Sequence, residues 1–270
     1  MIISACSDEI STDLATALDV LASENIEHVD LRGVWGKNVT DLSDEQAAEA
    51  QRLLKARGFT VTALSTPVGK TQITADFAPE IERFQRALAL AQRLEAPYLR
   101  VFSFYATEAE AREYQSEALS RLRKLCELAQ PYGIMLAHEN EEGGFCAWRP
   151  EECLLFHQQL PVNFRTLFEP CSFTVVGYDP TTDALPLLRD FIAYVHVRDT
   201  KRGTTQYSVA GEGDVRWRDI LADLKAHHFT GYLTLEPHLG WENYGQMTDE
   251  IRTANFRRAV QALRAVLATI

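Results

Sequence analysis

Four ionisable side chains stand where predicted β-strands end, and together they could bind a metal ion. They are Glu139, Glu169, His196 and Glu236. If their strands are neighbours in one parallel barrel, the side chains converge at its C-terminal mouth. Three carboxylates gathered there would repel one another and raise one another's pKa values unless a cation neutralised them. Carboxylates with one imidazole suit Mn²⁺, Mg²⁺ or Co²⁺, and Zn²⁺ is possible. The sequence therefore predicts one divalent metal ion.

The strands that would carry these residues alternate with helices along the whole chain. The polar ends of short apolar or β-branched runs recur about every 27 to 40 residues, the size of one βα unit. The runs are Ile2–Ser4, His28–Leu31, Thr60–Leu64, Tyr98–Phe102, Ile134–His138, Thr166–Phe168, Tyr194–Val197 and Tyr232–Leu235. Such alternation without a Pro/Gly-rich linker predicts an α/β fold, a single (β/α)₈ TIM-barrel domain spanning residues 1–270. No G-x-G-x-x-G motif follows the first run, which weakens the case for a Rossmann fold.

The segments between the runs have helical patterns. Asp44–Arg57 follows a Ser43 cap and ends at Gly58, a residue type common just beyond helix C-termini. Phe77–Leu94 carries apolar residues at helical spacing. The same pattern predicts helices over Glu108–Gln130, Trp217–Lys225 and Thr248–Ala268.

Composition excludes several classes of protein. The chain has 270 residues, 46% hydrophobic and 24% charged, which is ordinary for a globular protein. A net charge of −11 argues against nucleic acid as a partner. No apolar stretch is long enough to span a membrane, and the N-terminus lacks the basic region of a signal peptide, so we expect a cytoplasmic protein. The cysteines form no C-x-x-C pair, and we expect reduced structural thiols.

Several short motifs recur in a recognisable order and spacing. They are Asp30-Leu31-Arg32, Ser65-Thr66-Pro67-Val68-Gly69-Lys70, Arg100-Val101-Phe102-Ser103-Phe104-Tyr105, His138-Glu139-Asn140-Glu141, His196-Val197-Arg198-Asp199, Gly211-Glu212-Gly213-Asp214 before Trp217, and Gly231-x-x-x-x-Glu236-Pro237-His238. Together they resemble the sugar phosphate isomerase/epimerase group of xylose-isomerase-like TIM barrels, within the AP-endonuclease family 2 superfamily. The resemblance covers nearly the whole chain and implies an enzyme acting on a small-molecule sugar.

The resemblance also implies roles for the strand-end residues. Glu139, Glu169, His196 and Glu236 would bind the metal, and Glu139 and Glu236 would also transfer protons. A metal ion on a sugar's carbonyl and adjacent hydroxyl oxygens acidifies the intervening C–H and stabilises the enediolate. One glutamate would take the proton and the other return it, which gives epimerisation. Return to the neighbouring carbon gives isomerisation, and the sequence does not choose between them. The substrate would be a small sugar, keto-sugar or sugar phosphate.

Two features depart from the group's pattern. Related proteins usually have Asp at the strand-six ligand and Asn or His three residues later, whereas this chain has Glu169 and Ser172. A glutamate is one methylene longer and needs a set-back strand or a smaller pocket. The strand-five loop also adds acidic residues in Glu141–Phe145. An intact site with shifted geometry, a changed metal preference and a weakened site all remain open.

Basic side chains and histidines near the strand ends are candidates for substrate binding. Arg202 lies six residues after His196, where ketose epimerases of this group place an arginine facing substrate. As a group the cations suit an anionic or phosphorylated sugar, although Arg32 and Arg198 could equally be structural ion-pair partners. The candidates are Arg32, Lys70, Arg100, His138, Arg198, Arg202 and His238.

Three alternatives to the isomerase or epimerase stay open. The first is metal-dependent dehydration of a cyclic polyol of the inosose type, which shares the first proton abstraction. The second is a degenerate barrel that has lost its metal. The third is an AP-endonuclease-type nuclease, which needs extra histidines where this chain has Ser65-Thr66 and Ser103. Many barrels of this type pair up, so a homodimer is possible.

Overall fold

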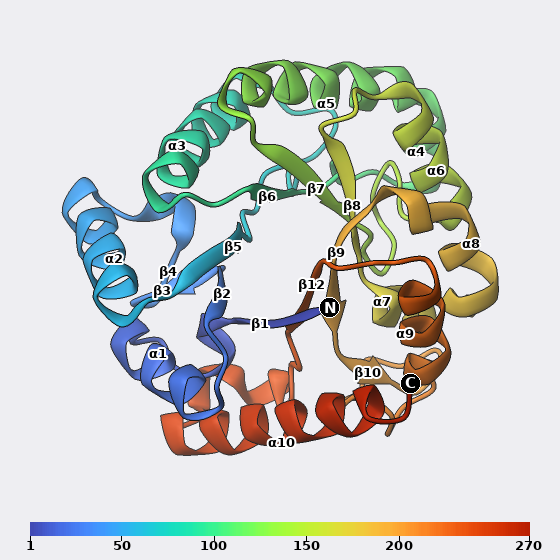
Figure 1. Ribbon diagram of the computed structural model, residues 1–270. Helices are drawn as coiled ribbons and strands as arrows, with labels where there is room; N and C mark the ends of the chain where they lie inside the picture. The colour runs from blue at the N-terminus through green and yellow to red at the C-terminus, as the bar shows by residue number, and fades with distance from the viewer.

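A closed parallel barrel forms the centre of the molecule. The computed structural model describes residues 1–270, except for the side chains of Trp241 and Tyr244. Over this described chain the strands close in the order β1-β12-β9-β8-β7-β6-β5-β2, the inner ring of Figure 1. Their bounds are β1 Ile2–Cys6, β2 His28–Leu31, β5 Thr60–Leu64, β6 Tyr98–Val101, β7 Met135–Glu139, β8 Phe164–Phe168, β9 Ile192–Val197 and β12 Tyr232–Leu235. The predicted TIM barrel is confirmed.

Helices surround the barrel as an outer ring (Figure 1). They are α1 Leu14–Ser23, α2 Asp44–Arg57, α3 Ala78–Leu94, α4 Glu108–Glu113, α5 Gln115–Ala129, α6 Pro150–Gln159, α7 Pro170–Val175, α8 Leu185–Leu188, α9 Trp217–Ala226 and α10 Asp249–Leu267. Helix α2 has the predicted bounds, with a Ser43–Gln46 capping box and Gly58 in the left-handed region at φ 72°. The helix predicted over Glu108–Gln130 is instead divided at Tyr114, whose φ and ψ of −97° and 13° interrupt it.

Short elements structure the loops between strands and helices. Two small antiparallel hairpins follow β2 and β9 respectively: β3 Gly33–Val34 with β4 Lys37–Asn38, and β10 Asp199–Thr200 with β11 Tyr207–Ser208. Brief helical turns complete the chain: η1 Ser7–Glu9, η2 Val39–Asp41, η3 Gln130–Tyr132, η4 Pro180–Ala184, η5 Arg189–Phe191 and η6 Trp241–Gln246. Because active sites of TIM barrels form from the loops after the strands, the hairpins help to shape the mouth.

Side-chain alternation decides which strand residues face the barrel interior. The apolar core lies mainly between strands and helices and includes Phe84, Phe156, Trp217 and Phe256, each at most 1% exposed. Successive strand residues point to opposite faces. In β7 this sends Glu139 inward, and the polar interior at the mouth is therefore built from alternate strand-end residues.

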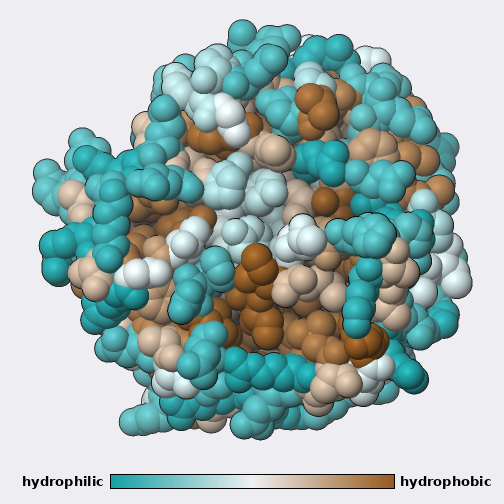
Figure 2. Space-filling view, in the orientation of Figure 1, coloured by the Kyte–Doolittle hydropathy of each residue, from teal (hydrophilic) through white to brown (hydrophobic). Residues whose placement is uncertain are grey.

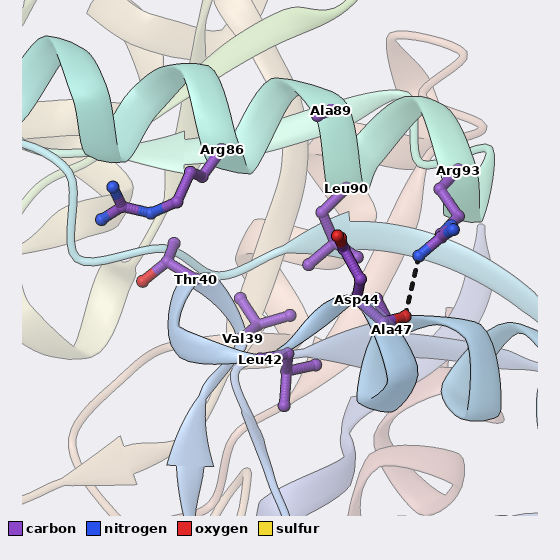
Figure 3. Close-up of a pocket in the computed structure, with 9 residues that line it drawn as sticks. All are labelled: Val39, Thr40, Leu42, Asp44, Ala47, Arg86, Ala89, Leu90 and Arg93. Atoms are coloured by element: carbon purple, nitrogen blue, oxygen red, sulfur yellow. Dashed lines mark hydrogen bonds between the residues drawn. The ribbon is translucent and has the colours of Figure 1, made fainter.

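The face shown in Figure 2 is mostly hydrophilic toward its rim, with hydrophobic residues gathered just below its centre. An outer pocket of about 340 Å³ lies between α3 and the η2–α2 segment, where Arg93 donates a hydrogen bond to the Asp44 carbonyl oxygen at 3.0 Å (Figure 3). None of the predicted site residues lines this pocket. No helix among the described residues is long and apolar enough to cross a membrane.

Candidate active site

The barrel brings the four predicted metal ligands together. Glu139 ends β7, Glu169 follows β8, His196 lies in β9 and Glu236 follows β12, and these strands are adjacent in the barrel. One potential ligand atom from each residue lies within 4.8 Å of every other. All four residues are at most 4% exposed.

The imidazole of His196 is oriented toward the carboxylates. Its Nδ1 lies 3.1 Å from Glu139 Oε1, 3.1 Å from Glu236 Oε2 and 3.8 Å from Glu169 Oε2. Its Nε2 faces the other way, 3.9 Å from Oδ2 of the fully buried Asp30. Burial opposes the charged form of His196, but Glu236 and Glu139 raise its pKa well above the usual value. When an ion is bound at Nδ1, Asp30 would stabilise the proton on Nε2.

Two arginines hold the outer oxygens of two glutamates. Arg32 Nη1 donates to Glu236 Oε1 at 2.6 Å, and Arg100 Nη1 lies 3.1 Å from Glu139 Oε2. In each glutamate the oxygen near the arginine differs from the oxygen near His196. The arginines therefore fix both carboxylates while leaving one oxygen of each directed at the cluster centre.

Glu169 is set back from the cluster by its own helix. It is the N-cap residue of α7, and its Oε1 accepts a hydrogen bond from the Cys171 backbone N–H at 2.9 Å. Arg198 Nε lies 3.2 Å from Oε2, and Arg198 Nη2 donates to Ser172 Oγ at 3.1 Å. This cap takes up the extra methylene of the glutamate. Burial raises the pKa of Glu169 to about 8, even though Arg198 opposes that shift.

The four residues fit a divalent ion. Oxygens on opposite sides of an ion with bonds of about 2.1 Å are about 4.2 Å apart. The potential ligand atoms lie within 4.8 Å of one another, so the side chains need only small shifts to bind an ion. Arg32, Arg100 and Arg198 neutralise part of the carboxylate charge, so the ion is not the only positive charge at the cluster. Nearby Cys6 forms a second grouping with His196 and Glu236, whose potential ligand atoms also lie within 4.8 Å of one another. Burial, together with Asp30, raises the pKa of its thiol well above the usual value.

A polar cavity of about 320 Å³ opens above the cluster. Glu139 and Glu236 reach it, whereas Glu169 and His196 are not among its lining residues. Of the predicted substrate-binding residues, Arg32, Lys70, Arg100, Arg198 and His238 line it. The full lining is Arg32, Lys70, Arg100, Glu139, Glu141, Glu142, Arg198, Tyr207, Glu236 and His238.

Two predicted substrate-binding residues lie away from this cavity. His138 alternates with Glu139 and so faces away from the barrel interior, where its ring stacks on Phe164 with centroids 5.4 Å apart. Burial lowers the pKa of His138 to about 4. Arg202 follows β10, and its exposed side chain donates to the Gly177 carbonyl oxygen at 3.0 Å. The loop between β10 and β11 carries Arg202 outward, so the structure does not bring either residue to the site.

Other residues at the site were not predicted from sequence. Glu9 Oε1 lies 2.7 Å from His238 Nδ1 and accepts from Arg32 Nη2 at 2.6 Å. Burial opposes ionisation of Glu9, yet His238 and Arg32 lower its pKa to about 2. Tyr207 donates to Glu142 Oε1 at 2.7 Å. Glu9 and Asp30 lie close to strand ends, which was a usable signal, but Tyr207 belongs to a hairpin that the strand pattern does not reveal.

Gly69 allows the loop that carries Lys70 to approach the backbone of Phe102, just after β6, closely. Its φ is +88°, and a Cβ there would lie 2.1 Å from the Phe102 carbonyl oxygen. We expect Gly69→Ala to lower the free energy of unfolding by more than about 2 kcal/mol, because backbone strain adds to a backbone clash. Urea denaturation measures this loss. Gly36→Ala is the control, since Gly36 has a φ of +73° but open space around it. Equal losses in the two variants would contradict the close-approach argument.

Known proteins with the same fold include several enzymes. A crystal structure of the probable 3-DHS dehydratase AsbF from Bacillus anthracis superposes with a TM-score of 0.78 at 17% identity, covering 98% of this chain and 99% of that one. The IOLI protein with a bound zinc atom gives 0.78 at 15% identity, with coverages of 100% and 97%. An L-ribulose 3-epimerase gives 0.75 at 16% identity, also with coverages of 100% and 97%. At such identities these likenesses show the fold alone.

Sequence comparison identifies the family. No curated protein sequence matches this chain. The profile described as xylose isomerase-like TIM barrel matches residues 18–266, which is most of the chain. The chain therefore belongs to the xylose isomerase-like TIM barrel family.

Proposed function

We propose that the protein is a divalent-metal-dependent isomerase or epimerase of a small keto-sugar. The observation that carries this proposal is the placement of two carboxylates at one cavity. Glu139 and Glu236 both line it, and both lie 3.1 Å from His196 Nδ1. They come from β7 and β12, which β8 and β9 separate in the barrel. Two bases approaching one point from different strands suit proton removal on one side of a carbon and proton return on the other.

In this proposal the residues of the cluster bind the ion, and two of them also transfer protons. Glu139, Glu169, His196 and Glu236 would hold the ion. When bound, the ion supplies Lewis-acid polarisation of a carbonyl group. Burial opposes ionisation of Glu139, but Arg100 and His196 lower its pKa to about 2, so it is an ionised base at neutral pH.

One glutamate would remove the proton next to the carbonyl, and the other would return a proton to the same carbon. Arg100 and Arg32 keep Glu139 and Glu236 in fixed orientations through their outer oxygens. Such positioning limits the rotamers available to each base and holds its inner oxygen near the reacting carbon.

Metal loading tests the proposal directly. After chelation and dialysis, isothermal titration with Mn²⁺, Mg²⁺, Co²⁺ and Zn²⁺ is expected to show one ion bound per chain. The loaded protein is then expected to exchange deuterium from solvent into ketoses at the carbon next to the carbonyl, which mass spectrometry detects. Chelated protein is the control for the exchange. A protein that binds none of these ions would contradict the proposal.

Dehydration of a cyclic polyol is the second candidate. The structural likeness to the probable 3-DHS dehydratase AsbF favours it, since elimination of water next to a carbonyl also begins with removal of a carbon-bound proton. The same incubations separate the two activities. An epimer or isomer keeps the mass of its substrate, apart from exchanged deuterium, whereas a dehydration product is lighter by one water.

A further inference from the structure

The charges around the cavity indicate which sugars it accepts. Its lining carries four cationic side chains and four carboxylates, together with Tyr207 and His238. Resting on the function proposed above, we propose that the substrate is an uncharged ketose or keto-polyol, and not a sugar phosphate or a sugar acid. Each positive charge of the lining already has a carboxylate partner.

Lys70 and Arg198 are each paired with a glutamate of the loop after β7, and Arg198 is also paired with Glu169. Lys70 Nζ lies 2.5 Å from Glu141 Oε1. Arg198 lies between Glu169 Oε2, at 3.2 Å from its Nε, and Glu142 Oε1, at 3.8 Å from its Nη2. An entering phosphate would have to compete with carboxylates that are already in place.

The other two cations, Arg32 and Arg100, each contact at least two carboxylates. Arg32 contacts Asp8 Oδ2 at 2.8 Å, Glu9 Oε1 at 2.6 Å and Glu236 Oε1 at 2.6 Å. Arg100 lies between Glu139 and Glu236. Every cationic side chain of the described cavity lining therefore has at least one carboxylate partner.

Further carboxyl groups lie behind the lining. Asp8, Glu9, Asp30 and Glu169 contact the lining residues or His196 from below. The described site thus holds eight carboxyl groups against four cationic side chains. With an ion bound, Glu169 and His196 would act as an ionised and a neutral ligand, and even if His238 is charged, the two charges of a divalent ion leave the site without a positive excess. A phosphate dianion in so small a space would meet net repulsion.

An uncharged polyol meets a different environment in the same cavity. Each hydroxyl group both donates and accepts hydrogen bonds. Paired arginines and glutamates present donors and acceptors side by side, so both functions of a hydroxyl find partners. The cavity volume of about 320 Å³ is at the lower end of the range of roughly 300–1,000 Å³ for small-molecule sites, as expected for a small sugar.

Matched substrates test the inference. Free pentuloses and hexuloses, their terminal phosphate esters and the corresponding keto acids are incubated with the metal-loaded protein in deuterated buffer. We expect kcat/KM for exchange to be at least about 100-fold higher for a free ketose than for its ester, the size of effect that like-charge contact produces. Equal or better exchange with the ester or the acid would overturn the inference and leave the proposed function standing. No exchange with any compound would overturn both.

Charge-removing variants give a readout independent of turnover. Glu141→Gln and Glu142→Gln release Lys70 and Arg198 from their acidic partners, so each is expected to tighten binding of inorganic phosphate by about tenfold or more, measured by isothermal titration. Glu82→Gln, at an exposed position of α3, makes the same change of charge away from the cavity and is expected to leave phosphate binding unaltered. Tight phosphate binding by the unmodified protein, or equal tightening in all three variants, would overturn the inference.

Discussion

Glu139→Gln and Glu236→Gln are each expected to lower the rate of ketose epimerisation by about 10²- to 10⁴-fold, the usual contribution of a general base. Glutamine keeps the shape of the side chain and an oxygen for the ion, but it cannot accept a proton from carbon. Initial rates measured by chromatography of the two epimers give the loss. Metal affinity is measured in the same variants, so that loss of the ion is distinguished from loss of the base.

The pattern of proton exchange separates two bases from one. If Glu139 and Glu236 act on opposite sides of the same carbon, each variant retains exchange of one epimer with solvent and loses exchange of the other. A single base would give loss of both exchanges in one variant and of neither in the other. Glu49→Gln, on the exposed face of α2, is the control. If both variants epimerise ketose at rates within tenfold of that of the unmodified protein, neither glutamate acts as a base, and the assignment is wrong.

The barrel and the cluster of four predicted metal ligands could be predicted from the sequence for physical reasons. Strand runs and polar strand ends recur at βα spacing, and the rule that active sites form at the C-terminal ends of barrel strands then brings Glu139, Glu169, His196 and Glu236 together. The structure places all four within one small volume. The choice of ligands needed only the identity of strand-end residues, which sequence supplies directly.

The side chains that contact these four residues could not be predicted in the same way. Sequence shows that Arg32 and Arg100 lie near strand ends, but not which carboxylate each contacts across the barrel. His138 was misplaced because strand alternation allows either member of the His138-Glu139 pair to face inward, and only the register decides. Arg202 was placed by its spacing from His196, whereas the β10–β11 hairpin turns its side chain outward.

The set-back of Glu169 also needed three-dimensional information. A longer acid at a ligand position is compatible with an intact, altered or weakened site. The cap that Glu169 provides to α7 and its contact with Arg198 favour the first, because they hold Oε2 3.8 Å from His196 Nδ1. A ligand held by its own helix costs little extra conformational entropy on binding an ion.

Arg32→Met is expected to lower the free energy of unfolding by about 3–5 kcal/mol, since removing one partner of a buried ion pair leaves the other charge uncompensated. Arg32 contacts three carboxylates, those of Asp8, Glu9 and Glu236, and its side chain is only 12% exposed. Urea denaturation of the metal-free protein at neutral pH measures the loss. Arg52→Met is the control, because Arg52 pairs with Glu49 on the surface and is 64% exposed, where a pair is worth about 0–1 kcal/mol.

The pH dependence of this loss identifies its electrostatic origin. In the unmodified protein burial disfavours the charged form of Glu9, but His238 and Arg32 together lower its pKa from 4.5 to about 2. A carboxyl group with a lowered folded-state pKa stabilises the fold above its unfolded value and loses that contribution as the pH falls toward the folded value. The difference in stability between Arg32→Met and the unmodified protein is therefore expected to shrink as the pH is lowered from 6 toward 3. Adding Glu9→Gln to Arg32→Met is expected to restore part of the loss at neutral pH. A difference that stays constant with pH and is not reduced by Glu9→Gln would indicate lost packing by the arginine side chain instead of an uncompensated charge.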